Sequence, residues 1–330
     1  MSGEREGGRG LFGLLLLLAL AALFPAVASD YETNLLGKFL AFAILALSLD
    51  LIWGYAGVVN FGHAIFFGLG AYAMGLVLKH VQVPGATYLA ILAAIAVPLL
   101  AGLVLGLFLF YGRVGGVYFG VVTLALTGVV QQLIIASNEM TGGLNGLYGY
   151  GEPKIGIPGL WEAGLYEADA AYYTILVGVV ACYALGRWLV HSDFGRAIRG
   201  IKENEARIEY LGYDVPLMKL TIFSISCAMA GFAGALYVPV GFISPDLVSL
   251  GMSAAVLVWV AVGGRGTLIG ALLGAVLVNY LQTLLSDALV VLWLLIVGLF
   301  FITVVLFWPG GLVGLLRSPW MQRHLPFLRV

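Results

Sequence analysis

Residues 51–78 read LIWGYAGVVNFGHAIFFGLGAYAMGLVL and contain no aspartate, glutamate, lysine or arginine. A membrane-spanning helix needs about 20 mostly apolar residues. Further charge-free runs cover residues 10–29, 114–138, 220–245, 267–286 and 288–316. The recurrence of such runs along the chain predicts a protein that crosses a membrane several times.

The composition of the whole chain agrees with this prediction. Of its 330 residues, 62% are hydrophobic and 10% are charged. An ordinary soluble domain is about 45–50% apolar and about 25% charged. Too few charges remain to cover a water-facing surface around a core of this size, which excludes a soluble enzyme. The formal net charge of −1 provides no basic field for binding nucleic acid.

Hydropathy predicts an all-α polytopic membrane protein with about ten transmembrane helices. The expected spans are 11–29, 35–53, 64–79, 87–110, 117–136, 172–190, 218–240, 249–264, 267–286 and 288–308. Most arginines between these spans fall on one side if both termini are cytoplasmic, as the positive-inside rule requires. Glycine, at 46 of 330 residues, is frequent enough for some helices to be broken at glycine-rich segments.

The chain is expected to have three parts. Residues 1–29 form a first transmembrane helix or, alternatively, a signal peptide cleaved near Ala28. Residues 30–317 form the transmembrane domain, and residues 318–330 form a cytoplasmic tail.

Two connections within the domain have distinct compositions. Residues 137–171 are glycine-rich and acidic, which predicts an irregular outer loop. Residues 191–217 hold the densest charge in the chain, and their apolar positions follow helical spacing. This pattern predicts one short amphipathic helix on the cytoplasmic side.

Asp50 is the one carboxylate inside a strongly apolar span. Ionisable groups in a membrane are costly and usually face the bundle interior or a water-filled cavity. Asp50, Asn60 and His63 are therefore candidates for a translocation pathway, together with Thr127 and Gln131 on one helix face. The alternative is structural: Asp50 would bond a donor in a neighbouring element, and the other polar side chains would join helices.

Motifs for catalysis are absent from the sequence. It contains no G-x-x-x-x-G-K-[ST] phosphate loop and no paired histidines at metal-ligand spacing. We therefore expect a non-catalytic transport protein without a metal or a cofactor. Gly266, Gly270 and Gly274 recur every four residues and predict a helix face for close packing.

Four stretches together resemble the inner-membrane permease of ABC importers for branched-chain amino acids and urea. They are SLDLIWGYAGVVNFGHAIFFGLGAYAMG (48–75), NEMTGGLNGL (138–147), GRAIRGIKENEARIEYLGYDVPLMKLTIFSISCAMAGFAGALY (195–237) and WVAVGGRGTLIGALLGAVLVN (259–279). The stretches LDLIWGY (49–55) and WVAVGGRGTLIGA (259–271) are similar to the urea-type permease, although Asn60 stands where that type is expected to have a serine.

The resemblance implies a multi-pass subunit of the cell inner membrane that passes a small polar solute. Urea is the first expectation, and branched-chain amino acids are the alternative. The implied partners are a second homologous permease, two cytoplasmic ATPase subunits that use the ATP, and an extracytoplasmic binding protein. The implied ATPase-coupling loop includes Arg199, Glu205, Ala206 and Gly212. A stand-alone channel or secondary transporter is a more distant alternative, disfavoured by the scarcity of intramembrane carboxylates.

Overall fold

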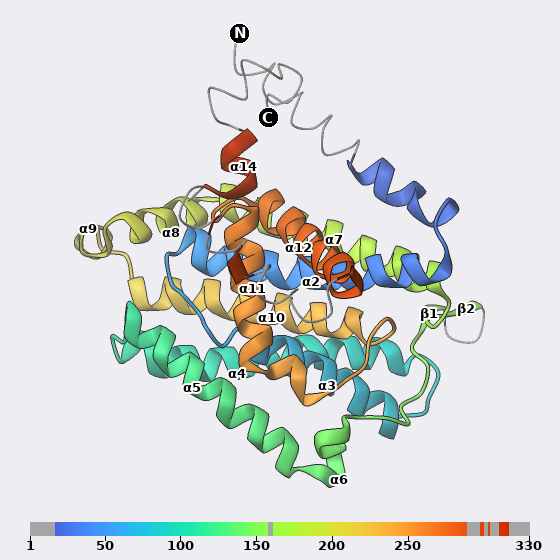
Figure 1. Ribbon diagram of the computed structural model, residues 1–330. Helices are drawn as coiled ribbons and strands as arrows, with labels where there is room; N and C mark the ends of the chain where they lie inside the picture. Colours follow the sequence, from blue (N-terminus) through green and yellow to red (C-terminus); the bar gives the residue numbers. More distant parts are fainter. Residues whose placement is uncertain (1–16, 158–160, 289–297, 300–302, 304–309, 317–330) are drawn as a thin grey trace.

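The computed structural model describes residues 17–157, 161–288, 298–299, 303 and 310–316. Across these ranges, six helices are long and apolar enough to span a membrane. They are α2 (Asp30–Asp50), α4 (Ala86–Tyr111), α5 (Val117–Ala136), α7 (Ala168–His191), α10 (Val215–Tyr237) and α12 (Leu268–Ala288). Shorter helices are Leu17–Ala26, α3 (Ala64–His80), α11 (Leu250–Gly263) and α14 (Gly311–Leu316). The chain is an all-α polytopic membrane protein (Figure 1).

The helices α2, α3, α4, α5, α7, α10, α11 and α12 each coincide with one expected span. The largest difference is at α2, which begins at Asp30 because Ser29 caps it. The Glu32 carboxylate accepts the Ser29 N–H at 2.9 Å, and the Ser29 hydroxyl accepts the Glu32 N–H at 3.4 Å, which is a capping box. The expected span 288–308 lies almost wholly outside the described residues, as do both termini. The total of ten spans and the position of the termini therefore stay predictions.

Helix Leu17–Ala26 packs on the first turns of α7. The Tyr172 hydroxyl donates to the Ala21 carbonyl at 2.7 Å, and the Tyr173 hydroxyl donates to the Ala22 carbonyl at 3.1 Å. The rings of Phe24 and Tyr172 stack at 6.3 Å between centroids. The segment is thus helical and packed on α7, and whether it is retained or cleaved near Ala28 stays a prediction.

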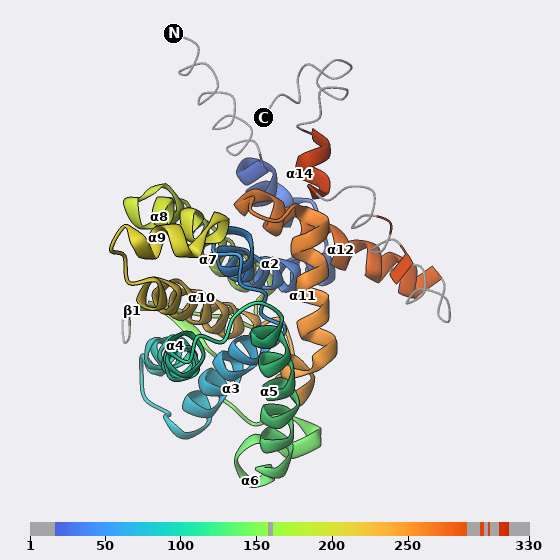
Figure 2. The same ribbon diagram turned by 90° about the vertical axis from the view of Figure 1, so that its left-hand side faces the viewer.

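Helix α10 lies at the centre of the bundle, packed against α4, α3 and α2. Helix α2 also packs against α7 and α12, and α12 packs against α11. Figure 2 views α2, α4, α7 and α10 nearly end-on, whereas α5 and α11 run across the view. Helix α5 lies at the edge of the bundle and leaves much of its apolar surface exposed. In a membrane, such a surface faces lipid or another membrane helix.

Three helices approach one another backbone to backbone. A Cβ on Gly70 of α3 would collide with the backbone of Gly231 of α10, and a Cβ on Gly231 would collide with the Ala94 carbonyl of α4. A Cβ on Gly234 would collide with the Phe67 carbonyl of α3. Small residues allow this close approach, which gives van der Waals packing between helices in a membrane.

The outer loop, residues 137–171, contains regular structure. It holds the short helices α6 (Asn138–Thr141) and η3 (Gly143–Asn145), followed by the antiparallel strands β1 (Lys154–Ile157) and β2 (Trp161–Gly164). The Tyr88 hydroxyl of α4 accepts the Gly156 N–H at 3.0 Å and so ties the hairpin to the bundle. The prediction of an irregular loop was wrong at this hairpin, because strand pairing satisfies backbone groups that an irregular loop would leave to water.

The connection 191–217 contains two helices, α8 (Asp193–Glu203) and α9 (Glu205–Tyr210), and the prediction of one helix was wrong. The break is at Asn204, whose backbone is extended and whose side chain accepts the Arg207 N–H at 3.0 Å. Asparagine is a favoured N-cap because its short side chain can bond the first free N–H groups. Figure 1 shows α8 and α9 at the left end of the bundle and β1–β2 at the right end. The two connections thus lie at opposite ends, as the expected topology requires.

Candidate functional site

Helix α2 ends at Asp50 and continues as the five-residue π-helical turn η2 (Leu51–Tyr55). Asp50 is fully buried, and its Oδ1 accepts a 2.7 Å hydrogen bond from the Gly266 N–H. Its Oδ2 has no hydrogen-bond partner among the described residues. A Cβ on Gly54 would collide with the carboxylate, so glycine lets the turn lie against it. Asp50 therefore joins the end of α2 to the turn between α11 and α12.

Asn60 and His63 lie in a second, separate polar cluster, which is also buried. The Gly62 N–H donates to Asn60 Oδ1 at 2.9 Å, and Asn60 Nδ2 lies 3.2 Å from His63 Nδ1. His63 Nε2 lies 2.8 Å from the Ser48 hydroxyl, which donates to the Leu45 carbonyl at 2.7 Å.

One arrangement of protons satisfies this whole chain of contacts. The Ser48 hydroxyl uses its hydrogen to bond the Leu45 carbonyl, so its oxygen accepts the N–H of His63 Nε2. His63 Nδ1 then carries no proton and accepts from the Asn60 amide. The network assigns a neutral His63 with its proton on Nε2, and every polar atom of the ring is paired.

The polar face of α5 meets this cluster only in part. Thr123 and Thr127 are buried, and the Thr123 hydroxyl accepts the Phe61 N–H at 3.2 Å. A Cβ on Gly62 would lie 3.0 Å from the Thr127 hydroxyl, so α5 lies directly against the segment before α3. Gln131 is half-buried on the next turn of α5. The structure thus brings Asn60, His63 and Thr127 near one another, whereas Asp50 lies in a different cluster.

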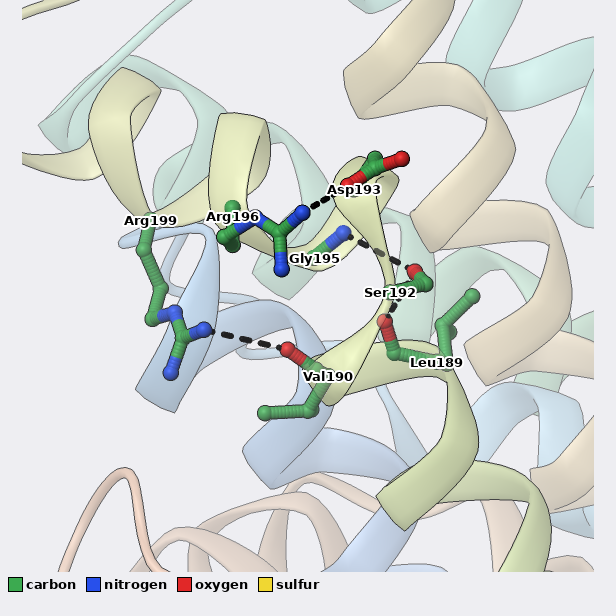
Figure 3. A network of polar contacts seen from close by, with 7 residues as sticks. All are labelled: Leu189, Val190, Ser192, Asp193, Gly195, Arg196 and Arg199. Carbon is green, nitrogen blue, oxygen red and sulfur yellow. Dashed lines mark hydrogen bonds and ion pairs between the residues drawn. The ribbon is translucent and has the colours of Figure 1, made fainter.

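The junction between α7 and α8 is held by local hydrogen bonds (Figure 3). The Ser192 hydroxyl accepts the Gly195 N–H at 3.2 Å and donates to the Leu189 carbonyl at 2.6 Å. The Arg199 guanidinium donates to the Val190 carbonyl at 3.2 Å. Three of the bonds drawn in Figure 3 therefore return to the last turn of α7 or cap α8, which sets the direction of α8.

Two ion pairs connect α9 to neighbouring segments. Glu205 pairs with Lys219 of α10 at 2.6 Å, and Glu209 pairs with Arg113 of the α4–α5 loop at 3.1 Å. Ala206 is exposed on α9. Helices α8 and α9 together are called the α8–α9 unit. In α8, Ile198 and Ile201 are buried in the bundle. The α8–α9 unit is therefore anchored by apolar contacts at one face and by charges at its edge.

The chain turns back after α9 at Gly212, whose φ is +89°. This left-handed backbone favours glycine. The side chains around the turn are exposed: Tyr210 is 93% exposed, Leu211 is 67% exposed and Tyr213 is 50% exposed. Together Tyr210, Leu211 and Tyr213 form an apolar tip at the end of the α8–α9 unit.

A cavity of about 510 Å³ lies beside the α8–α9 unit, with a smaller one of about 120 Å³ next to it. The larger cavity has an apolar wall that includes Phe61 and Phe110, and its charged groups are Lys202, Glu205 and Lys219. It therefore separates part of α8 from the loops before α3 and α5.

The expected glycine face of α12 is only partly present. Gly266 lies in the turn before α12 with a φ of +80°, so its place on a helix face was wrong. Gly270 and Gly274 do lie on α12, where a Cβ on either would collide with α11, at Gly263 and at the Trp259 carbonyl respectively. Gly266 fits the four-residue spacing although it precedes the first residue of α12. The sequence alone does not show where the glycine-rich turn ends and the helix begins.

Sequence reasoning missed Ser48 and Lys202. The Lys202 ammonium donates to the Gly54 carbonyl at 2.5 Å. One signal was available: Lys202 follows the buried Ile198 by four residues and so shares its helix face. Over the described ranges, no three His, Cys, Asp or Glu residues are grouped as metal ligands. The absence of a cofactor stays a prediction.

Comparison with known proteins adds an independent finding. Residues 32–305 match the family described as branched-chain amino acid transport system / permease component. The chain is similar to the high-affinity branched-chain amino acid transport system permease protein LivM of Escherichia coli (strain K12), with 30% identity over 325 residues, which cover 92% of this chain and 75% of that protein.

Two other relatives are more distant. A probable branched-chain amino acid transport permease protein LivM of Methanocaldococcus jannaschii is 25% identical over 288 residues, covering 78% of this chain and 82% of that protein. The ribose import permease protein RbsC of Escherichia coli (strain K12) is 26% identical over 287 residues, covering 82% of this chain and 83% of that protein. No solved structure matches the chain.

The family match covers all the described helices from α3 to α12 and most of α2. Relatives in this family are permease subunits, which are transport components and not enzymes. The family match and the six apolar helices of the described residues make the chain a multi-pass inner-membrane protein. It belongs to the family of branched-chain amino acid transport system permease components.

Proposed function

We propose that this chain is a permease subunit of an ABC importer that passes branched-chain amino acids into the cytoplasm. The α8–α9 unit is the observation that carries the proposal, because it projects a charged surface and an apolar tip from one end of an apolar bundle. A protein with no phosphate loop of its own needs a partner to supply energy from ATP. The relatives named for branched-chain amino acids support this solute over urea.

The α8–α9 unit is proposed to receive the ATPase on the cytoplasmic side. Its buried Ile198 and Ile201 hold α8 in the bundle, while Tyr210, Leu211 and Tyr213 are free to enter a groove on a partner. Aromatic side chains supply much of the binding energy at protein interfaces. The remaining proposed partners are a second homologous permease, a second ATPase subunit, an extracytoplasmic binding protein at the outer loop, and the lipid bilayer.

We propose that α5 lines the pathway for the solute. Its edge position and the half-buried Gln131 support this role. Asn60 and His63 were candidates for the same pathway, but all their ring and amide contacts are internal, which favours a role in holding α2, α3 and α5 together. The Asp50 carboxylate bonds the Gly266 N–H, which favours the structural alternative for that residue too.

Uptake by the reconstituted complex tests which solute the protein transports. The permease pair, its ATPases and its own binding protein are placed in vesicles, and uptake of labelled leucine, isoleucine, urea and ribose is measured with ATP. Leucine or isoleucine uptake that requires the binding protein is expected. Urea uptake without leucine uptake would overturn the proposed solute and restore the urea-type expectation. A complex that takes up leucine without ATP or binding protein would overturn the importer itself.

A further inference from the structure

One lysine of α8 reaches the π-helical turn at the end of α2. Lys202 Nζ donates to the Gly54 carbonyl at 2.5 Å. The aliphatic part of the side chain lies over Gly57, where a Cβ would be 2.9 Å from Lys202 Cγ. Lys202 therefore extends from the α8–α9 unit to η2, and this contact joins two elements that are far apart in the sequence.

The same turn holds a buried carboxylate with too few partners. Asp50 Oδ1 accepts the Gly266 N–H, and Asp50 Oδ2 has no partner in the part of the chain that the structure describes. A buried carboxylate needs a countercharge or further hydrogen bonds to offset the loss of water. Gly54 lies between the two charged groups, since its Cα is against the Asp50 carboxylate and its carbonyl is bonded to Lys202.

Two cations lie on segments that contact the Asp50 carboxylate: Lys202 is bonded to the Gly54 carbonyl, and Arg265 directly precedes Gly266. Arg265 is exposed, and its guanidinium carbon lies 5.4 Å from the centre of the Trp53 ring. Lys202 is the better placed of the two because its ammonium is bonded within the turn that touches the carboxylate.

We infer that Lys202 is a positioning residue that supplies the countercharge of Asp50 and so connects movement of α8 to the turn between α11 and α12. The inference rests on the proposed function, in which the ATPase moves the α8–α9 unit. Lys202 also lines the cavity of about 510 Å³, so its side chain is not packed on every side and can move when α8 is displaced. A displacement of α8 is then transmitted by the Asp50 carboxylate to Gly266, which bonds it from the turn before α12.

A double-mutant cycle tests this connection in the reconstituted complex. The variants are Lys202→Met, Asp50→Asn and the double variant. Lys202→Arg keeps the charge, and Lys79→Met, in the last turn of α3, removes a lysine charge elsewhere as a matched control. Two quantities are measured: the leucine moved per ATP hydrolysed, and the melting temperature of the purified complex. We expect Lys202→Met to lower the leucine-to-ATP ratio about tenfold, a size within the range of coupling between groups of one network. Lys202→Arg restores most of the ratio, and Lys79→Met leaves it unchanged.

The cycle separates this inference from a merely stabilising contact. In the D50N background, Lys202→Met is expected to have no further effect on either quantity. Independent effects that multiply would overturn the inference, as would a normal leucine-to-ATP ratio in Lys202→Met. If Asp50→Asn does not assemble, equal losses in Lys202→Met and Lys202→Arg would overturn it, and rescue by arginine would support it. If the wild-type complex moves no leucine, the proposed function fails, and the melting temperatures of the cycle still decide whether Lys202 acts through Asp50.

Discussion

His63 Nε2 lies 2.8 Å from the Ser48 hydroxyl, and this contact fixes the end of α2 against the start of α3. Both side chains are fully buried. The Ser48 carbonyl also accepts a hydrogen bond from the Ser226 hydroxyl of α10, so one residue joins three helices. A buried network of this kind stabilises a structure only while each member keeps its partner.

His63→Ala should therefore destabilise the protein strongly. The change removes the N–H that the Ser48 oxygen accepts and the ring nitrogen that accepts the Asn60 amide N–H. Each buried polar group left unsatisfied costs about 1–3 kcal/mol. We expect a clear fall in the melting temperature of the purified subunit in detergent. His80→Ala is the matched control, because the His80 ring is exposed and bonds only the Leu76 carbonyl of its own helix. Equal melting temperatures for the two variants would contradict the network.

Gly70→Ala should disrupt the contact between α3 and α10. The new methyl group would meet the Gly231 backbone, which cannot move aside as a side chain can. Overpacking of this kind costs about 1–3 kcal/mol or more. Gly128→Ala on α5 is the control, since a Cβ there has open space within 4 Å. The yield of folded protein after purification should fall for Gly70→Ala alone; a fall of the same size for both would refute the close approach.

Gly212→Val should reduce transport more than Gly212→Asn. A Cβ at this position has open space, so the cost comes from the φ of +89° and not from a clash. A left-handed backbone costs an ordinary residue about 1–2 kcal/mol, and asparagine tolerates it better. We expect leucine uptake to fall in the valine variant while the complex still hydrolyses ATP. Full uptake with valine would show that the turn at Gly212 is not needed for coupling.

Cysteine labelling should place the two connections on opposite sides of the membrane. Tyr148 in the outer loop is 65% exposed and Leu211 in the apolar tip is 67% exposed. Both native cysteines, Cys182 and Cys227, are buried, so their background reaction should be low. A membrane-impermeant thiol reagent added outside cells should label Tyr148→Cys, and it should label Leu211→Cys only in inverted vesicles. The reverse result would invert the topology.

The helices were predictable because hydropathy acts over about 20 residues at a time. The predicted spans 87–110 and 117–136 differ from α4 and α5 by at most one residue at each end, since Gly85, Gly112 and Gly116 flank those helices. Local features were less predictable. The break at Asn204 depends on one cap, and the π-helical turn after Asp50 depends on the close fit of Gly54 against a carboxylate from the preceding turn.

The candidate site was predicted only as a set of residue types. Asp50, Asn60 and His63 were identified as unusual in a membrane, and all three are buried. The partner of Asp50 could not be predicted, because Gly266 lies far along the chain and pairing over such a distance depends on tertiary structure. The Gly266 partner is also a backbone N–H, which no pattern of side chains reveals.

The glycine contacts among α3, α4 and α10 have a consequence for how the protein can change shape. Backbones that touch directly have no intervening rotamers to absorb a displacement, so these helices can shift only as one rigid block. Distances between them should stay constant through every stage of transport. Spectroscopic labels on this block would provide an internal reference frame. Any displacement of α5 or α12 during transport could then be measured against it within a single molecule.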